Sequence, residues 1–153
     1  WGRPDMALFK FTKSMINGEA IDVYNHGDMS RDFTYIDDIV DSIILMLDNV
    51  AENSCSEPNK DRQNDKISPV APFRVVNIGN AQPEKLIHFI EAIELALGIN
   101  AKKNFLPMQA GDVPKTWAST EILEKLTGRR PKTNIVDGVK IFVDWYLEYY
   151  EVK

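Results

Sequence analysis

The apolar residues of this chain recur mainly at the spacing of an α-helix, whereas its β-prone runs are short and separated. Five stretches carry helical stripes or helix-end signals, and they lie at residues 1–18, 36–50, 86–97, 119–128 and from Thr133 or Asn134 through Tyr150. Short strands are expected at residues 21–24, 31–36, 73–79 and 104–106. No segment repeats at a fixed period. The pattern therefore predicts an α/β domain in which helices outnumber strands.

The expected helix ends coincide with residues that favour such positions. Pro4 suits the first turn of the first helix, and Gly18 suits its carboxyl end. Asp37 and Asp38 open the second helix, where their negative charges complement the positive end of the helix dipole. We expect this role for them rather than metal binding. Ser119 is the expected amino-terminal cap of the short fourth helix.

Residues 51–72 differ in character from the rest of the chain. Ser, Asn, Lys, Glu and Asp dominate there together with three prolines, and no apolar period is visible. We expect a long flexible surface loop within a single domain spanning residues 1–153. The first residue is Trp1 rather than Met, which leads us to expect that the chain begins inside a longer protein.

The composition argues against several classes of protein. A net charge of −5 and a pI near 5.1 disfavour a broad nucleic-acid surface, which needs a basic face. The single cysteine, Cys55, cannot form a disulfide framework, and His26 and His88 have no partners at metal-ligand spacing. No apolar run reaches the length of a membrane span. We expect a cytoplasmic protein without a metal site and without nucleic-acid or membrane partners.

Three residues have the chemistry of an anion and sugar site. Arg3 precedes a helix start, and Arg31 opens a strand after a glycine-containing turn, so either guanidinium could hold a phosphate. Asp112 follows Gly111 in a proline-bounded loop, where its carboxylate could accept hydrogen bonds from the hydroxyl groups of a ribose. Each also has a structural interpretation, as a solvated arginine or a simple turn. The Tyr149 to Lys153 spacing imitates a dehydrogenase catalytic pair, but its position at a helix end indicates chance.

Several motifs follow one another in an order that is more informative than any of them alone. They are Gly2-Arg3-Pro4-Asp5-Met6-Ala7, Val23-Tyr24-Asn25-x-Gly27, Arg31-Asp32-Phe33-Thr34-Tyr35-Ile36-Asp37-Asp38, Asn77-Ile78-Gly79-Asn80, Gln109-Ala110-Gly111-Asp112-Val113 and Asp137-Gly138-Val139-x-x-Phe142-Val143-x-Trp145-Tyr146. Apart from residues 51–72, this order resembles the carboxy-terminal, substrate-binding part of the extended short-chain dehydrogenase/reductase epimerases. The first and third motifs most resemble the branch that acts on UDP-glucuronate.

The resemblance implies a binding site for the nucleotide sugar. It places Arg3 beside the sugar nucleotide and Arg31 on the diphosphate, and it places Asp112 on the uridine ribose. Galactose-specific relatives have a second phosphate arginine three residues before this aspartate. The position is Gln109 here, which favours the glucuronate branch and leaves the diphosphate to Arg31 and Arg3.

The uracil, by the same resemblance, would be bound mainly by backbone. The start of the first helix, near Met6 and Ala7, would approach the base. The strand Asp22-Val23-Tyr24 would continue that pocket through main-chain contacts.

The resemblance also implies the reaction of the whole enzyme, a 4-epimerization of a nucleotide sugar by hydride removal and return through tightly bound NAD. The catalytic Tyr, Lys and Ser or Thr and the glycine-rich NAD turn belong to an amino-terminal Rossmann portion, and this sequence contains no G-x-G-x-x-G pattern. We therefore expect neither catalytic residues nor a bound cofactor on this chain. We expect it to be inactive alone and to bind a UDP-sugar. The whole enzyme would supply precursors of capsule or lipopolysaccharide. A related dehydratase or decarboxylase, or a non-catalytic binding module, remains the alternative.

The same resemblance predicts how the chain behaves alone. The helix at 36–50 and the strand at 73–79 would pack on the Rossmann portion. Without it they would expose apolar surface, so self-association is expected.

Overall fold

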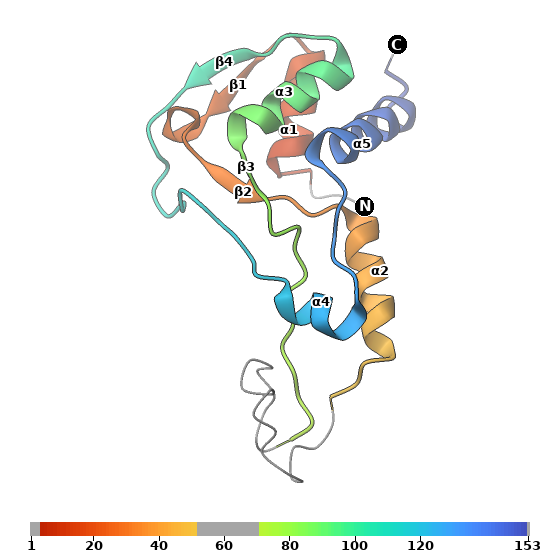
Figure 1. Ribbon diagram of the computed structural model, residues 1–153. Coiled ribbons are helices and arrows are strands. Elements are labelled where there is room, and N and C mark those ends of the chain that lie inside the picture. Colours follow the sequence, from red (N-terminus) through yellow and green to blue (C-terminus); the bar gives the residue numbers. More distant parts are fainter. Residues whose placement is uncertain (1–3, 52–70, 153) are drawn as a thin grey trace. The chain divides into compact units, whose positions relative to one another are not determined.

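The computed structural model describes residues 4–51 and 71–152, and Figure 1 shows its elements in chain order. The predicted loop at 51–72 lies almost wholly outside the described residues, as does Arg3. The elements are α1 (Ala7–Ile16), β1 (Ala20–Val23), the 3-10 helix η1 (Tyr24–Gly27), β2 (Ser30–Asp32), α2 (Ile36–Leu47), β3 (Pro83–Lys85), α3 (Leu86–Leu97), β4 (Lys102–Phe105), α4 (Glu121–Thr127) and α5 (Ile135–Tyr149). The prediction of a mixed α/β fold in which helices dominate is confirmed.

These elements form two compact units. The first contains Trp1–Arg31, Pro83–Thr116 and Asn134–Lys153, and the second contains Asp32–Gln82 and Trp117–Thr133. Because the chain passes between the units several times, each is built from segments that are distant in sequence. Every described residue predicted for the nucleotide site falls in the first unit.

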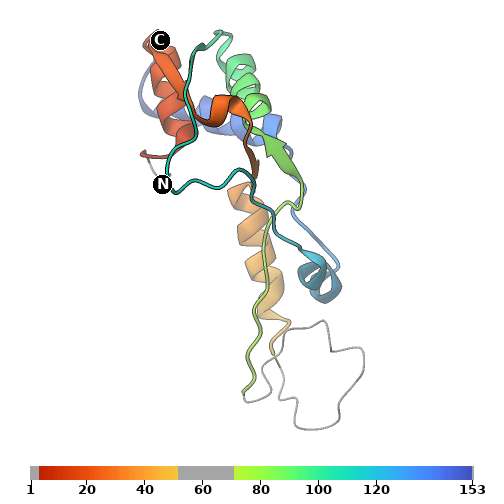
Figure 2. The same cartoon turned by 90° about the vertical axis from the view of Figure 1, so that its left-hand side faces the viewer.

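The first unit is organised around a parallel pair of strands. β1 pairs with β4 from Ala20 opposite Lys102 to Val23 opposite Phe105. Figure 1 shows the two strands side by side. In β1 the side chains of Ile21 and Val23 are buried, whereas Ala20 and Asp22 are exposed, as expected when one face of a strand is covered. α1 packs against β1, and Figure 2 shows the two elements side by side.

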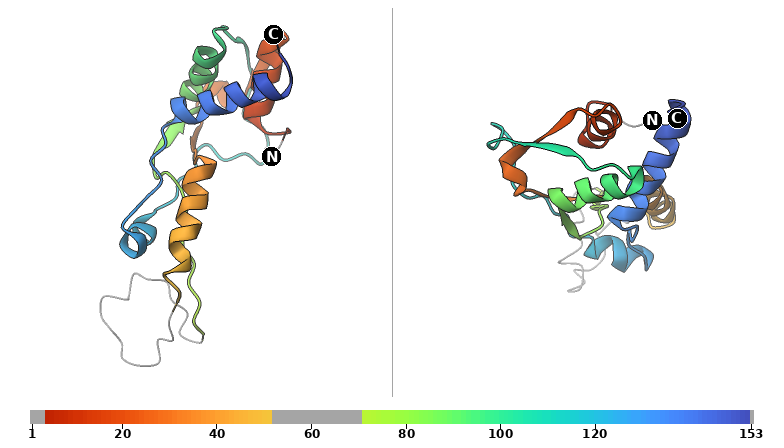
Figure 3. Two further views of the ribbon diagram at one scale, coloured as in Figure 1. Left: turned by 90° about the vertical axis from the view of Figure 1, so that its right-hand side faces the viewer. Right: turned by 90° about the horizontal axis from the view of Figure 1, so that it is seen from above.

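The core of the first unit lies between three helices and this strand pair. α3 packs on both α1 and α5, and Figure 3 shows α5 crossing α3. Ile90, Ile93 and Val143 are fully buried, and Phe9 of α1 makes an edge-to-face contact with Phe142 of α5 at 4.8 Å between ring centroids. Helical apolar spacing therefore does decide which faces of α3 and α5 meet.

The second unit contains α2, α4 and the irregular segments 71–82 and 117–133. α2 packs against α4, and Leu123 and Pro131 are its largest fully buried residues. The Asp38 carboxylate accepts the backbone N–H of Thr133 at 2.9 Å, which ties α2 to the segment after α4. Asp38 therefore has a specific structural partner in addition to the dipole role expected from its place in the first turn of α2.

Several helix ends agree with the sequence, and two do not. Asn134 caps α5 through a hydrogen bond from Asp137 N to its Oδ1 at 2.9 Å, and Gly98 ends α3 in the left-handed conformation as expected for that position. The predicted placement of Pro4 in the first turn of α1 is wrong, because extended backbone at Met6 delays the helix until Ala7. Ser119 is not the cap of α4, since Thr120 occupies that position without a side-chain capping bond.

The largest error in the strand prediction concerns residues 73–79. This segment forms no named strand, and Phe73 and Val75 are more than half exposed instead of buried. Within the described residues, no backbone hydrogen bond is made by residues 75–78, and only Arg74 of this segment is assigned to a β-bridge. The segment is held in part by its side chains, for example by the bond from Asn77 Nδ2 to Ser119 O.

Other strands differ from the prediction in extent. β2 ends at Asp32, four residues earlier than expected, because Tyr35 already caps α2. β4 begins at Lys102 rather than at residue 104. β3 was not predicted at all: Pro83, Glu84 and Lys85 have low β-propensity, and they form a strand because β2 lies beside them.

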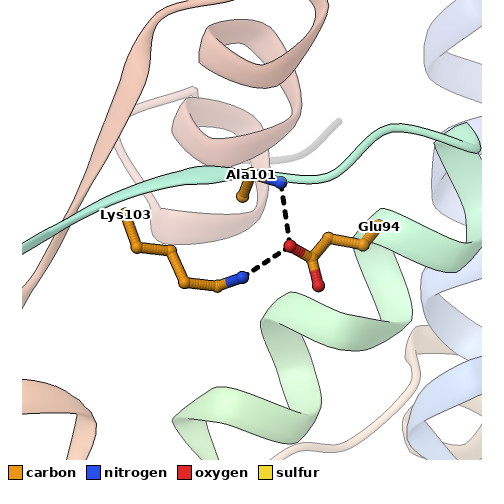
Figure 4. A network of polar contacts seen from close by, with 3 residues as sticks. All are labelled: Glu94, Ala101 and Lys103. Atoms are coloured by element: carbon orange, nitrogen blue, oxygen red, sulfur yellow. Dashed lines mark hydrogen bonds and ion pairs between the residues drawn. The ribbon is translucent and has the colours of Figure 1, made fainter.

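A partly buried ion pair fastens β4 to α3. Glu94 Oε1 accepts Lys103 Nζ at 2.5 Å and Ala101 N at 2.8 Å, as Figure 4 shows. Burial alone would raise the pKa of Glu94, but the hydrogen bonds from Lys103 and Ala101 and the lysine charge outweigh it and lower the pKa below 4.5. The ionised form is therefore preferred in the folded chain.

Substitution Glu94→Gln is expected to destabilise the first unit by about 1–2 kcal/mol at pH 7, because a charge-assisted bond is lost. Since the folded pKa is depressed, the stabilisation is complete above the unfolded pKa and disappears as pH falls through the folded one. Urea unfolding of both proteins between pH 7 and pH 3 measures this. The two curves should converge at the acidic end, and a constant gap would contradict the assignment.

Candidate functional site

Arg31 is anchored to the backbone of two segments that are far apart in sequence. Its Nη1 donates to the carbonyl oxygen of Ser30 at 2.9 Å and to that of Pro114 at 3.3 Å. The side chain is half-buried, and its charge is not paired with a carboxylate in any described ion pair. The guanidinium is held in place through Nη1, and its Nε and Nη2 atoms are not among the donors of these two bonds. A guanidinium in this arrangement is suited to bind a phosphate through two parallel hydrogen bonds.

The segment that receives Arg31 is joined to β2 by a short ladder. Ser30 pairs with Lys115 in a parallel bridge, with Ser30 N donating to Pro114 O at 2.9 Å and Thr116 N donating to Ser30 O at 3.2 Å. The loop before this bridge carries Gln109 and Asp112, whose side chains are exposed. The structure therefore attaches Arg31 and the loop that carries Asp112 to the same short ladder.

The other end of this loop is attached to β1 and η1. Leu106 N donates to Val23 O at 3.0 Å, and His26 N donates to Leu106 O at 3.0 Å. Tyr24 opens η1 and is half-buried. The loop that carries Asp112 is thus fixed at one end beside the predicted uracil strand and at the other beside Arg31.

Asp22 has a partner that the sequence did not reveal. Its Oδ1 accepts Asn104 Nδ2 at 2.9 Å, and the two residues stand opposite each other in the β1–β4 pair. The Asp22 carboxylate therefore helps to join the two strands.

The remaining predicted residues lie at the start of α1. Met6 is the N-cap and half exposed, and Ala7 is the first helical residue. α1 packs on β1, but no described hydrogen bond links Met6 or Ala7 with Arg31, Gln109 or Asp112. The structure places these two residues in the same unit as the other described site residues.

Sequence reasoning missed the residues that support the site. Ser30, Pro114 and Thr116 act through backbone atoms, so their side chains gave no chemical signal. Only the proline content of the loop indicated a rigid segment. Asn104 could have been found only by knowing the register of β1 against β4.

A separate hollow lies in the second unit. It has a volume of about 420 Å³ and is lined by Asp38, Asp41, Ser42, Leu45, Arg129, Arg130 and Lys132. None of the described residues predicted for nucleotide binding lines it. Its acidic and basic side chains are mixed, so the hollow has no single ligand charge to which it is suited.

Metal and membrane chemistry receive no support from the described part of the chain. No group of three or more His, Cys, Asp or Glu side chains there could hold a metal ion. No described helix is long and apolar enough to cross a membrane. The sequence does not contain the glycine-rich turn that holds the pyrophosphate of a dinucleotide in Rossmann folds.

The chain is similar in sequence to several known proteins. Residues 2–60 match the model of the NAD dependent epimerase/dehydratase family. The chain is 53% identical to Protein CapI of Staphylococcus aureus, over 99% of this chain and 45% of that protein. It is 51% identical to a probable UDP-glucuronate 4-epimerase of Rhizobium meliloti (strain 1021), over 98% of this chain and 44% of that protein. The chain spans less than half the length of these relatives.

Solved structures show the same relationship. A UDP-glucuronic acid 4-epimerase from Bacillus cereus, in complex with UDP-glucuronic acid and NAD, superimposes with a TM-score of 0.75 at 28% identity, over 97% of this chain and 41% of that one. A UDP-glucose 4-epimerase from Thermotoga maritima superimposes with a TM-score of 0.74 at 21% identity, over 95% of this chain and 40% of that one, which shows the shared fold.

Fold and sequence point to the same class of protein. The chain is similar to the carboxy-terminal part of proteins of the NAD dependent epimerase/dehydratase family, whose model matches residues 2–60. Within this family, it is similar in sequence to UDP-glucuronate 4-epimerases, which confirms the expected resemblance.

Proposed function

We propose that this chain is the sugar-nucleotide-binding portion of a UDP-glucuronate 4-epimerase. The observation that carries the proposal is the anchoring of Arg31 on the Asp112 loop, because it joins the two residues suited to a diphosphate and a ribose. The similarity to UDP-glucuronate 4-epimerases supports the choice of substrate. Arg3 lies outside the described residues and is proposed as a second contact to the sugar nucleotide.

Each group has a distinct task in this proposal. Arg31 binds the diphosphate and neutralises part of its charge, and Asp112 accepts hydrogen bonds from the ribose hydroxyls. Gln109 offers an uncharged amide on the same loop. The main chain of Asp22-Val23-Tyr24 and of Met6-Ala7 borders the uracil. Together these contacts hold the nucleotide handle, so that the sugar is oriented for reaction elsewhere.

The chemical step is assigned to the portion of the relatives that this chain does not match. NAD supplies reversible hydride transfer at the sugar in the proposed whole enzyme, and the residues present here do not form its site. We therefore propose that residues 1–153 alone are inactive as an epimerase while they retain affinity for the nucleotide. Assaying the isolated chain for conversion of UDP-glucuronate with added NAD tests this, and measurable turnover would refute it.

Arg31→Ala is expected to weaken UDP binding by about 10- to 100-fold, because hydrogen bonds to charged groups contribute about 1.5–3 kcal/mol. Uridine lacks the diphosphate, so its affinity should change much less. Calorimetric titration of both ligands measures the difference. Arg130→Ala removes the same charge from the second unit and serves as the control, and equal effects of the two substitutions would exclude Arg31 from the site.

We also propose that the isolated chain self-associates through α2. Five apolar side chains at helical spacing are exposed on this helix, namely Ile36, Val40, Ile43, Ile44 and Leu47. A continuous apolar stripe of this kind is seldom left in contact with water on a monomer. The strand predicted to share this role, at 73–79, also exposes Phe73 and Val75.

Sedimentation equilibrium is expected to show a concentration-dependent increase in mass for the native chain. Leu47→Glu should shift the distribution toward monomer, because it places a charge in the stripe. Ile141→Glu, at an exposed position of α5, provides the matched control. A monomer at every concentration, or an equal response of the two variants, would count against α2 as the contact.

A further inference from the structure

The two protons on Nη1 of Arg31 are already engaged by the protein. Nη1 donates to Ser30 O and to Pro114 O, at 2.9 and 3.3 Å. A guanidinium has five N–H donors, so the remaining three are on Nε and Nη2. Only the edge formed by these two nitrogens is left for a ligand.

The same two carbonyl oxygens also hold the ladder between β2 and residues 114–116. Pro114 O accepts Ser30 N at 2.9 Å, and Ser30 O accepts Thr116 N at 3.2 Å. Each oxygen is therefore shared between a backbone bond and the Arg31 side chain. Because the ladder fixes where these oxygens point, it also sets the orientation of the guanidinium.

The Asp112 loop depends on its two ends for its conformation. Residues 107–113 are all exposed, and the one described backbone hydrogen bond within this stretch joins Asp112 N to Gln109 O at 3.2 Å. Leu106 fixes one end on β1 and η1, and Pro114 fixes the other end on Ser30. Pro114 is only two residues from Asp112. A displacement of the Pro114 carbonyl that accompanies loss of the Arg31 bond should therefore also displace the Asp112 carboxylate.

We propose that Arg31 and Asp112 form one energetically coupled binding unit and that Pro114 is the positioning residue that couples them. This inference rests on the proposed nucleotide-binding function. The Pro114 ring restricts the backbone next to the shared carbonyl. Its oxygen links the guanidinium to the loop. Loss of the Arg31 side chain removes one of the bonds at this anchor, so it also weakens the hold of Asp112 on the ribose.

A double-mutant cycle on the full 153-residue chain tests the coupling, with UDP affinity measured for Arg31→Ala, Asp112→Ala and the double variant. Residues in one hydrogen-bond network couple by amounts that correspond to at least about 2-fold in affinity. The double variant should therefore lose less affinity than the product of the two single losses, by about 2-fold or more. Fold-losses that multiply exactly would refute the coupling.

A second pair of variants tests the position of the coupling. Pro114→Gly keeps the carbonyl group but makes the backbone next to it flexible. In this background the losses of UDP affinity from Arg31→Ala and Asp112→Ala should become additive in free energy. Hydrogen exchange at the Ser30 amide should also become faster in the absence of ligand. Pro107→Gly loosens the other end of the loop and should preserve the non-additivity, because the Arg31 anchor remains. Equal behaviour of the two glycine variants would refute the positioning role of Pro114.

The outcomes also separate this inference from the proposed function. If neither Arg31→Ala nor Asp112→Ala weakens UDP binding, the nucleotide site itself is refuted. If both weaken binding and their effects multiply, the site stands and only the coupling is refuted.

Discussion

Ile93→Ala should lower the free energy of unfolding of the first unit by about 2–5 kcal/mol, the range for removing a buried aliphatic side chain and leaving a cavity. Ile93 is completely buried on α3, which contacts both α1 and α5. Its loss removes packing at the centre of the unit, and neighbouring helices cannot close the space without disturbing one another. This is a large share of the stability of a small protein.

Urea unfolding followed by amide signals of α3 and α5 measures the Ile93 effect within its own unit. Ile141→Ala is the matched control, because Ile141 is 48% exposed on α5. A surface substitution of this kind is expected to change stability by no more than about 0.5 kcal/mol. Similar losses for the two variants would show that the centre of the core lies elsewhere.

Asp32→Ala is expected to destabilise the second unit by about 3 kcal/mol, because two backbone donors lose a charged acceptor. The Asp32 Oδ2 atom accepts Ala81 N at 3.1 Å and Ala118 N at 3.2 Å, so one carboxylate joins three segments of the chain. Gly79 makes room for it, since a Cβ at that position would lie 3.1 Å from the same oxygen.

Hydrogen exchange at the Ala81 and Ala118 amides reports directly on Asp32. Both amides should exchange faster in Asp32→Ala, whereas Asp32→Asn retains a side-chain oxygen and should lose less protection. Asp41→Ala removes an exposed carboxylate from α2 and should leave both amides unchanged. Unchanged protection in Asp32→Ala would contradict the account of this carboxylate as a clamp.

The sequence predicted helices better than strands for a physical reason. α3 and α5 bury their apolar faces within the described structure, and Gly98 and Asn134 mark their ends by local backbone chemistry. Strand formation depends on a partner that local sequence does not reveal. Residues 73–79 have strong β-propensity but no ladder among the described residues, whereas β3 has weak propensity and a partner in β2.

The candidate site was predicted from the sequence only as far as side-chain chemistry allows. Arg31 and Asp112 were singled out by their residue types and by the resemblance. Their connection runs through the backbone of Ser30 and Pro114, which no residue type indicates. The structural role of Asp22 was likewise hidden, because it depends on Asn104 lying opposite in the next strand.

Amide and arginine side-chain NMR of the chain during titration with UDP tests the central claim most directly. The nucleotide-binding account predicts that shifts concentrate at Arg31 Nε, in the loop from Gln109 to Thr116 and along Asp22-Val23-Tyr24, all within the first unit. Shifts confined to α2 and α4, or none at saturating UDP, would contradict it.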